Sequence, residues 1–232
     1  QEDVAGIYKR LTYADALITT LSEGIINELH IGLKGTMNAL FVKDLAVKTR
    51  RGLEGRVRKG KSGGGKAYGY DVVKQTDENG NPIRGDRTIN EVEAGVIRRI
   101  FEMFAQGHSP RAIAKFLNGE TIPGPTGRPW RDTTIRGHHT RRTGILPDDL
   151  YSGRLVWNKQ RFVKDPITGK RLARSNPEDQ WIYHDVPHLR IIDQELWNQV
   201  QARLDGIRHS PAVSNARDTR FWEHRRPRHL FT

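Results

Sequence analysis

The sequence predicts an α+β fold that is mainly helical. Apolar residues recur at three- and four-residue steps around residues 33–45, 92–104 and 196–204, a spacing that places them on one face of a helix. Shorter runs rich in β-branched and aromatic residues, such as residues 67–74, are typical of strands. The chain of 232 residues is long enough for one large or two small domains.

The composition favours a nucleic-acid partner. The formal net charge is +12 at pH 7, and a basic excess of this size is typical of proteins that bind polyanions. A ribosomal or merely soluble basic protein has a similar balance, so charge alone leaves that alternative open. The chain has no cysteine, which excludes disulfides and thiolate zinc sites. No apolar run approaches the roughly 20 residues of a membrane-spanning helix, so no membrane partner is expected.

Residues 32–61 are predicted to form one long helix, because no proline interrupts them. Its first half carries an apolar stripe at Leu33, Met37, Leu40, Phe41 and Leu45. Its second half is strongly basic, and residues 62–66 follow as a predicted glycine hinge. We expect a strut that lies against DNA phosphates, with a solvated helix face as the plainer alternative. The expected phosphate contacts are Lys48, Arg50, Arg51, Arg56, Arg58, Lys59, Lys61 and Lys66.

The segment before the long helix resembles the end of an α/β unit. Residues 1–11 are predicted as a short helix, with acids near its start and basic residues near its end, where the helix dipole favours them. Residues 15–21 are apolar and partly β-branched, which predicts a buried strand. About 31 residues are too few for an independent core, so residues 1–31 are expected to be the remnant of a larger domain.

After the hinge, residues 67–74 and 83–89 are predicted as two strands joined by a turn at Asn79-Gly80. Asn90 is expected to cap a helix that stops at Gly107. The predicted core stripe of that helix is Val92, Val96, Ile97, Ile100, Phe101 and Phe104.

The next segment has the layout of a helix-turn-helix. Ser109-Pro110 is expected to open one helix, whose apolar face is Ala112, Ile113, Phe116 and Leu117. A long turn over residues 122–130 leads to a third helix, residues 134–140, capped by Asp132 or Thr133. An ordinary helical hairpin is the alternative, but the surplus of basic residues favours a DNA reader. The expected DNA contacts here are Arg111, Arg128, Arg131, Thr133, Thr134, Arg136, His138, His139, Arg141 and Arg142.

The C-terminal third is predicted to contain strands at residues 151–157 and 181–183, separated by a polar loop around residues 165–169. A final helix starts near Asp193, and residues 209–232 form a basic tail. The tryptophans Trp130, Trp157, Trp181 and Trp197 are expected to anchor cores.

The sequence offers no residue set for catalysis. The glycine run at residues 62–66 lacks the phosphate-loop spacing and follows a helix. The histidines show no metal spacing, and neither Ser22 nor Ser62 has an activating cluster nearby. We therefore expect no catalytic residue, cofactor or metal in this chain.

Several segments together resemble the large serine recombinases of the resolvase/invertase superfamily. They are ADALITTLSEG, GLKGTMNALFVKDLAVKTRRGLEGRVRKGKSGGGKAYGYDVV, INEVEAGVIRRIFEMFAQGHSPRAIAKFLNGETIPGP, WRDTTIR and LYSGRLVWNK. The resemblance implies that residues 1–31 end a resolvase-like catalytic domain and that residues 32–61 form the connecting helix used in dimer and tetramer contacts. It also implies a recombinase DNA-binding domain at residues 67–208, with residues 209–232 leading to a zinc ribbon.

The chain also departs from that family. In these enzymes a serine in the N-terminal domain attacks the scissile phosphate, and no position here matches that serine or the arginines around it. The zinc-ribbon cysteines are absent as well. We therefore expect the middle of a cytoplasmic, bacterial nucleoid-associated recombinase, which binds double-stranded DNA but does not cleave it alone. A non-enzymatic remnant that occupies recombination sites or regulates an intact recombinase is one alternative, and a general RNA-binding protein is another.

Overall fold

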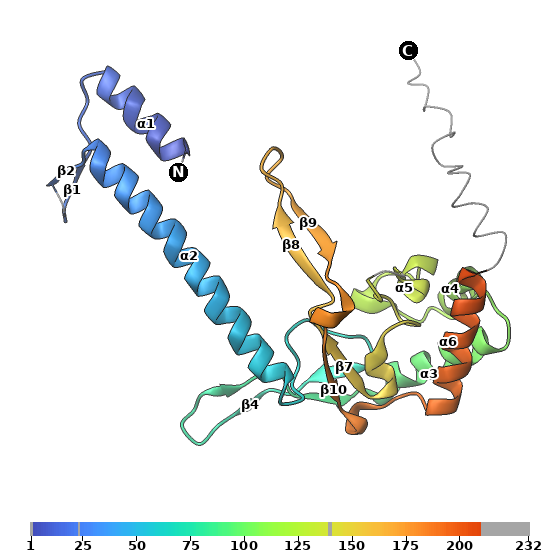
Figure 1. Cartoon of the computed structure of the whole chain (residues 1–232). Coiled ribbons are helices and arrows are strands. Elements are labelled where there is room, and N and C mark those ends of the chain that lie inside the picture. The colour runs from blue at the N-terminus through green and yellow to red at the C-terminus, as the bar shows by residue number, and fades with distance from the viewer. Residues whose placement is uncertain (1, 23, 139–140, 210–232) are drawn as a thin grey trace, which may run out of the picture. The chain divides into compact units, whose positions relative to one another are not determined.

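The computed structural model describes residues 2–22, 24–138 and 141–209. It is mixed α+β and about half helical, and the described residues form five two-stranded antiparallel sheets. This confirms the predicted α+β class. The chain divides into two compact units, residues 1–55 and 56–232, which are described separately (Figure 1). Within the described residues no helix is both long enough and apolar enough to cross a membrane.

The first unit contains helix α1 (Glu2–Tyr13), the paired strands β1 (Thr19–Thr20) and β2 (Gly24–Ile25), and most of helix α2 (Glu28–Val57). The short first helix is confirmed. The buried strand predicted at residues 15–21 is wrong, because only two of those residues pair and the side chains of Leu17 and Leu21 are exposed. The described part of this unit buries a single apolar side chain, Ile26, so it has no layer that could cover such a strand.

The long helix is confirmed. Helix α2 is 30 residues long, about 45 Å at 1.5 Å per residue, and it both begins and ends four residues earlier than the predicted range of residues 32–61. Asn27 precedes it, and its side-chain oxygen accepts a hydrogen bond from the backbone N–H of His30 (3.0 Å). The predicted apolar stripe lies in the open, with Leu33, Met37 and Leu40 each 56–61% exposed.

The second unit begins with two small antiparallel sheets. Strand β3 (Tyr70–Val72) pairs with β6 (Arg87–Ile89), and β4 (Gln75–Thr76) pairs with β5 (Pro82–Ile83). The predicted turn is confirmed: the Asp77 carboxylate accepts hydrogen bonds from the backbone N–H groups of Asn79 (3.0 Å) and Asn81 (2.8 Å). The predicted return strand is split into β5 and β6.

Three helices cross the core of this unit: α3 (Glu91–Ala105), α4 (Pro110–Gly119) and α6 (Gln194–Arg208). The expected caps Asn90 and Ser109 are confirmed, since each side chain accepts a hydrogen bond from a backbone N–H in the first turn. Asp193 caps α6 in the same way.

Helix α3 buries Ile97, Ile100, Phe101 and Phe104 completely, as predicted. Val92 was assigned to the same stripe but is 82% exposed. At 100° per residue it lies about 140° around the helix from Ile97, which is outside the covered face.

An aromatic cluster joins distant parts of this unit. The ring of Phe101 lies 6.1 Å from Tyr151 and 5.9 Å from Trp197, and Tyr70 stacks on Tyr151 at 5.9 Å. The Tyr70 hydroxyl donates to the Leu189 carbonyl (2.8 Å), and the Tyr151 hydroxyl donates to the carbonyl of Tyr68 (3.0 Å). Strand β3, helices α3 and α6, and the 3₁₀ helices η2 (Asp149–Ser152) and η4 (Pro187–Leu189) therefore share one core.

Of the four tryptophans expected to anchor cores, Trp130, Trp181 and Trp197 are buried and Trp157 is half-buried.

The tyrosines of this core predict that the protein loses stability at alkaline pH. Burial, together with the charge of Glu93, raises the pKa of Tyr68 to about 12, and burial also raises the pKa of Tyr70 and of Tyr151. The unfolded chain ionises these groups near pH 10, so the free energy of unfolding should fall as the pH rises above about 10. Urea unfolding at pH 8 and pH 11, followed with tyrosinate absorbance, measures this. Ionisation of all six tyrosines near pH 10 in a chain that stays folded would contradict it.

Candidate nucleic-acid interface

The expected third helix exists but is short. Helix α5 spans Asp132–Arg136, and Arg131 occupies its N-cap position without a side-chain cap. The predicted helix at residues 134–140, capped by Asp132 or Thr133, is therefore wrong in both bounds. The helix ends because Gly137 has a φ of +68°, and because the chain turns back there to pair His138 with Thr143. A Cβ at Gly137 would collide with the Thr143 carbonyl, so this close approach requires glycine.

The side-chain amide of one α4 residue forms two hydrogen bonds that hold the segment before α5 against α4. The Asn118 side chain donates to the Trp130 carbonyl (2.9 Å) and accepts from the Trp130 N–H (2.8 Å). The Trp130 ring is buried and meets Tyr68 edge-on at 5.1 Å. Ile135 of α5 is fully buried. The start of α5 is thus fixed in position by α4 and the core.

This packing leaves basic side chains exposed around the α4–α5 pair. Arg111, Arg128 and Arg131 are exposed, and in the part of the chain that the structure describes they form no ion pair within 4.0 Å. Arg136 is exposed and lies 3.7 Å from Asp132, a separation at which a surface ion pair contributes little. A shallow groove between the helices is lined by Arg111, Ala114, Lys115, Asn118, Trp130 and Asp132. Lys115, which was not among the expected contacts, belongs to this surface.

A family model that matches this part of the chain identifies the family of the protein. The family model described as Recombinase matches residues 91–206, which is half of the chain and includes α3, α4, α5 and all but the last two residues of α6. The chain belongs to the Recombinase family. This is the domain family of the large serine recombinases. No curated protein sequence matched the chain.

Within the Recombinase domain, the other residues that were expected to contact DNA differ in how exposed they are. Thr133 and His138 are exposed, whereas Thr134 and Arg141 are half-buried. The Thr134 carbonyl accepts a hydrogen bond from the N–H of Ile145 (3.1 Å). His139 lies outside the described residues.

Arg142 forms contacts within the second unit that stabilise the fold. Its guanidinium donates to Asp149 (2.9 Å), and its carbonyl accepts from the ammonium of Lys159 (3.2 Å), which also lies 3.3 Å from Asp149. Arg142 has a φ of +44°, and the Asp149 side chain is only 9% exposed. Because this guanidinium is needed by a buried carboxylate, the geometry argues against Arg142 as a DNA contact.

The basic residues of α2 and of the segment that follows it lie on both sides of the boundary between the units. In the first unit Lys48, Arg50 and Arg51 are exposed, and Lys48 lies 2.7 Å from the carboxylate of Asp44 one turn earlier. In the second unit Arg58, Lys59 and Lys66 are exposed, whereas Arg56 and Lys61 are half-buried.

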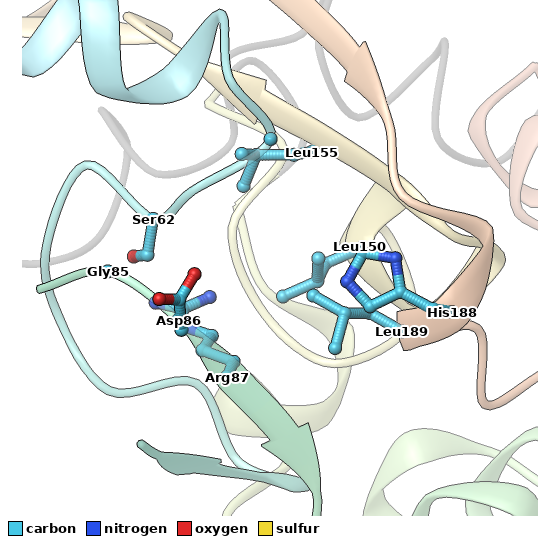
Figure 2. A pocket seen from close by; sticks show the side chains of 9 residues that line it. Ser62, Gly85, Asp86, Arg87, Leu150, Leu155, His188 and Leu189 are labelled. Atoms are coloured by element: carbon cyan, nitrogen blue, oxygen red, sulfur yellow. The ribbon is translucent and has the colours of Figure 1, made fainter. Parts of the chain in front are cut away.

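The segment predicted as a hinge is attached to the second unit at its first residues. Lys61 pairs with Asp86 (2.7 Å), and the N–H of buried Ser62 donates to the Gly85 carbonyl (2.7 Å). Figure 2 shows Ser62, Asp86 and Arg87 on one side of a small pocket, opposite His188 and two leucines.

The Arg87 guanidinium donates to the carbonyl of Gly65 (2.7 Å). A Cβ at Gly63 would lie 2.7 Å from the Trp157 ring, so this glycine also permits close packing. The hinge itself stays a prediction. No group of three or more candidate metal ligands occurs among the described residues.

Replacing Arg142 should separate folding from DNA binding. In Arg142→Gln the Asp149 carboxylate keeps Lys159 but loses its shorter contact, so we expect a loss of about 1–3 kcal/mol in the free energy of unfolding. The salt dependence of DNA affinity should not change, because no phosphate contact is removed. Urea denaturation and fluorescence anisotropy measure the two effects. A variant as stable as wild type with a reduced salt dependence would reverse this assignment.

Proposed function

We propose that this chain is the DNA-binding portion of a serine site-specific recombinase and binds duplex DNA during integration, excision or inversion. Membership of the Recombinase family supports a role in DNA recombination. The observation that carries the proposal is the fixed α4–α5 pair with its surrounding exposed arginines. On this proposal α5 enters the major groove, and the basic residues around it contact phosphates.

The shortness of α5 limits which side chains can read bases. Recognition helices use residues near their N-terminus, where Arg131 and Thr133 are exposed. Arg136, at the C-terminal end of this single-turn helix, is exposed as well. Arginine fits the O6 and N7 acceptors of guanine, and a threonine methyl fits the methyl group of thymine. Arg111, Lys115 and Arg128 lie nearby and would then position the domain without specifying sequence.

Duplex DNA suits this surface better than duplex RNA. The major groove of B-DNA admits an α-helix, whereas the major groove of A-form RNA is too deep and narrow for side chains to read. The RNA-binding alternative therefore requires a surface other than the exposed N-terminus of α5.

The test compares two double variants of the full chain that lose the same formal charge. Arg111→Gln/Arg128→Gln removes two exposed arginines of the proposed interface that are assigned to phosphates. Arg98→Gln/Arg154→Gln removes two that already lie 3.3 and 3.4 Å from the carboxylates of Glu91 and Asp185. Anisotropy with a labelled duplex of random sequence gives affinity between 50 and 200 mM salt.

We expect wild-type affinity to fall on the order of a hundredfold over this range if about four phosphates are contacted. The interface variant should lower the salt slope by about 2, because each phosphate contact contributes about 1. The matched control should keep the wild-type slope. Affinity that is independent of salt, or an equal effect of the two variants, would refute the proposal.

The exposed stripe of α2 supports self-association through this helix. Leu33, Met37 and Leu40 recur on one face and are all more than half exposed, and burying such side chains is favourable. We propose that a second copy of the chain covers them.

Leu40→Glu should then shift the weight-average mass measured by sedimentation towards the monomer. Val42→Glu adds the same charge about 180° around the helix from Leu33 and should leave the mass unchanged. A wild-type chain that stays monomeric at the highest soluble concentration would contradict this proposal.

A further inference from the structure

A basic two-stranded ribbon forms a second positively charged surface of the Recombinase domain. Strands β8 (Gln160–Lys164) and β9 (Arg171–Ser175) pair along their full length and extend from the second unit (Figure 1). Between residues 160 and 175 the chain has five basic residues and one acid. That acid, Asp165, is used in the turn, where it accepts hydrogen bonds from Thr168 and from the N–H of Ile167.

The register places like charges directly opposite each other. Arg161 is paired with Arg174, and Lys164 is paired with Arg171. Side chains opposite each other in an antiparallel pair project from the same face with Cβ atoms about 5 Å apart, and like charges there are destabilising. No ion pair with a carboxylate is found for these four side chains among the described residues. The ribbon therefore has a charge arrangement that a bound anion would relieve.

The two like-charged pairs lie on opposite faces of the ribbon. Because side chains alternate along a strand, Arg161 and Arg174 project from one face while Lys164 and Arg171 project from the other. Apolar groups are exposed on both faces as well, with Phe162 54% and Leu172 43% exposed. A flat anionic surface would meet only one face, whereas a groove with a phosphate wall on each side would meet both.

The base of the ribbon is held firmly. Asn176 is buried, and its side chain donates to the Asn158 carbonyl (2.8 Å) and accepts from Arg161 (3.1 Å). Its backbone N–H donates to the Lys159 carbonyl (3.0 Å), and its own carbonyl accepts from the indole N–H of Trp181 (3.0 Å). A ribbon anchored in this way has a fixed direction from the domain, which lowers the cost of ordering it on a partner.

We propose that the β8–β9 ribbon is a second DNA-contacting element, which lies in the major groove with phosphates on both sides. The major groove is wide enough for a two-stranded ribbon. The inference deepens the proposed function, since it takes duplex DNA as the partner and assigns it a contact separate from α5. Charged edge strands also prevent aggregation between sheets, and the experiment distinguishes that explanation.

The test uses the full chain with Arg171→Gln/Arg174→Gln, which leaves one positive charge in each opposed pair. Its matched controls are Arg98→Gln/Arg154→Gln, with the same charge loss, and Arg131→Gln in α5. The probe is a duplex enriched from a random pool by the wild-type chain. Affinity, salt slope, protection of guanine N7 from methylation and thermal unfolding are measured.

We expect the ribbon variant to lose five- to fiftyfold in affinity and about 2 in salt slope. It should also lose a group of protected guanine N7 positions that Arg131→Gln retains. Its unfolding temperature should not fall, because the replaced side chains repel their neighbours.

The contrary outcomes are distinct. Aggregation of the ribbon variant with wild-type affinity would support the edge-protection role and overturn the inference. Lost affinity without any change in N7 protection would overturn the groove placement. If the wild-type chain and the ribbon variant bind DNA with equal affinity while Arg131→Gln binds more weakly, the inference about the ribbon is refuted and the proposed function stands. If the wild-type chain binds no duplex, both the inference about the ribbon and the proposed function are refuted.

Discussion

Burial of the apolar face of α3 is the interaction on which the second unit depends. Phe101 lies between Tyr151 and Trp197, and Ile97 and Phe104 on the same face are fully buried. Each such side chain contributes roughly 1.5–3 kcal/mol when it leaves water. Because their partners come from β3, η2 and α6, this face unites segments about 100 residues apart. The α4–α5 pair contributes Ile113, Leu117 and Ile135 to that core.

The placement of the acids determines where positive charge remains on the surface. Asp149 pairs with both Arg142 and Lys159, Asp86 pairs with Lys61, and Glu120 pairs with Arg99. Other acids are used in turns, as in the β4–β5 and β8–β9 connections. Few carboxylates are therefore left near α5 or along the ribbon. Positive charge therefore remains on both elements, and an asparagine side chain holds each of them in place.

The family match and the structural unit do not coincide. The Recombinase match begins at residue 91, whereas the compact unit begins at residue 56. The residues between them are required by the core, since Tyr70 is buried against Tyr151 and its hydroxyl bonds the carbonyl of Leu189. Lys61 and Ser62 are also bonded to the β5–β6 connection. A Recombinase domain cut at residue 91 would lack one side of its core.

The sequence by itself determined the long helix, the caps at Asn90 and Ser109, the start of the last helix near Asp193, and the buried face of α3. Those features depend on groups within a few residues of one another, so local spacing is enough to predict them. Only the tertiary structure decided the short α5, the internal role of Arg142 and the ribbon, whose two strands lie between the predicted strands at residues 151–157 and 181–183. Each depends on a partner from elsewhere in the chain: Thr143 approaching Gly137, Asp149 accepting from Arg142, and β9 pairing with β8. Such contacts are set by packing, and no local pattern records them.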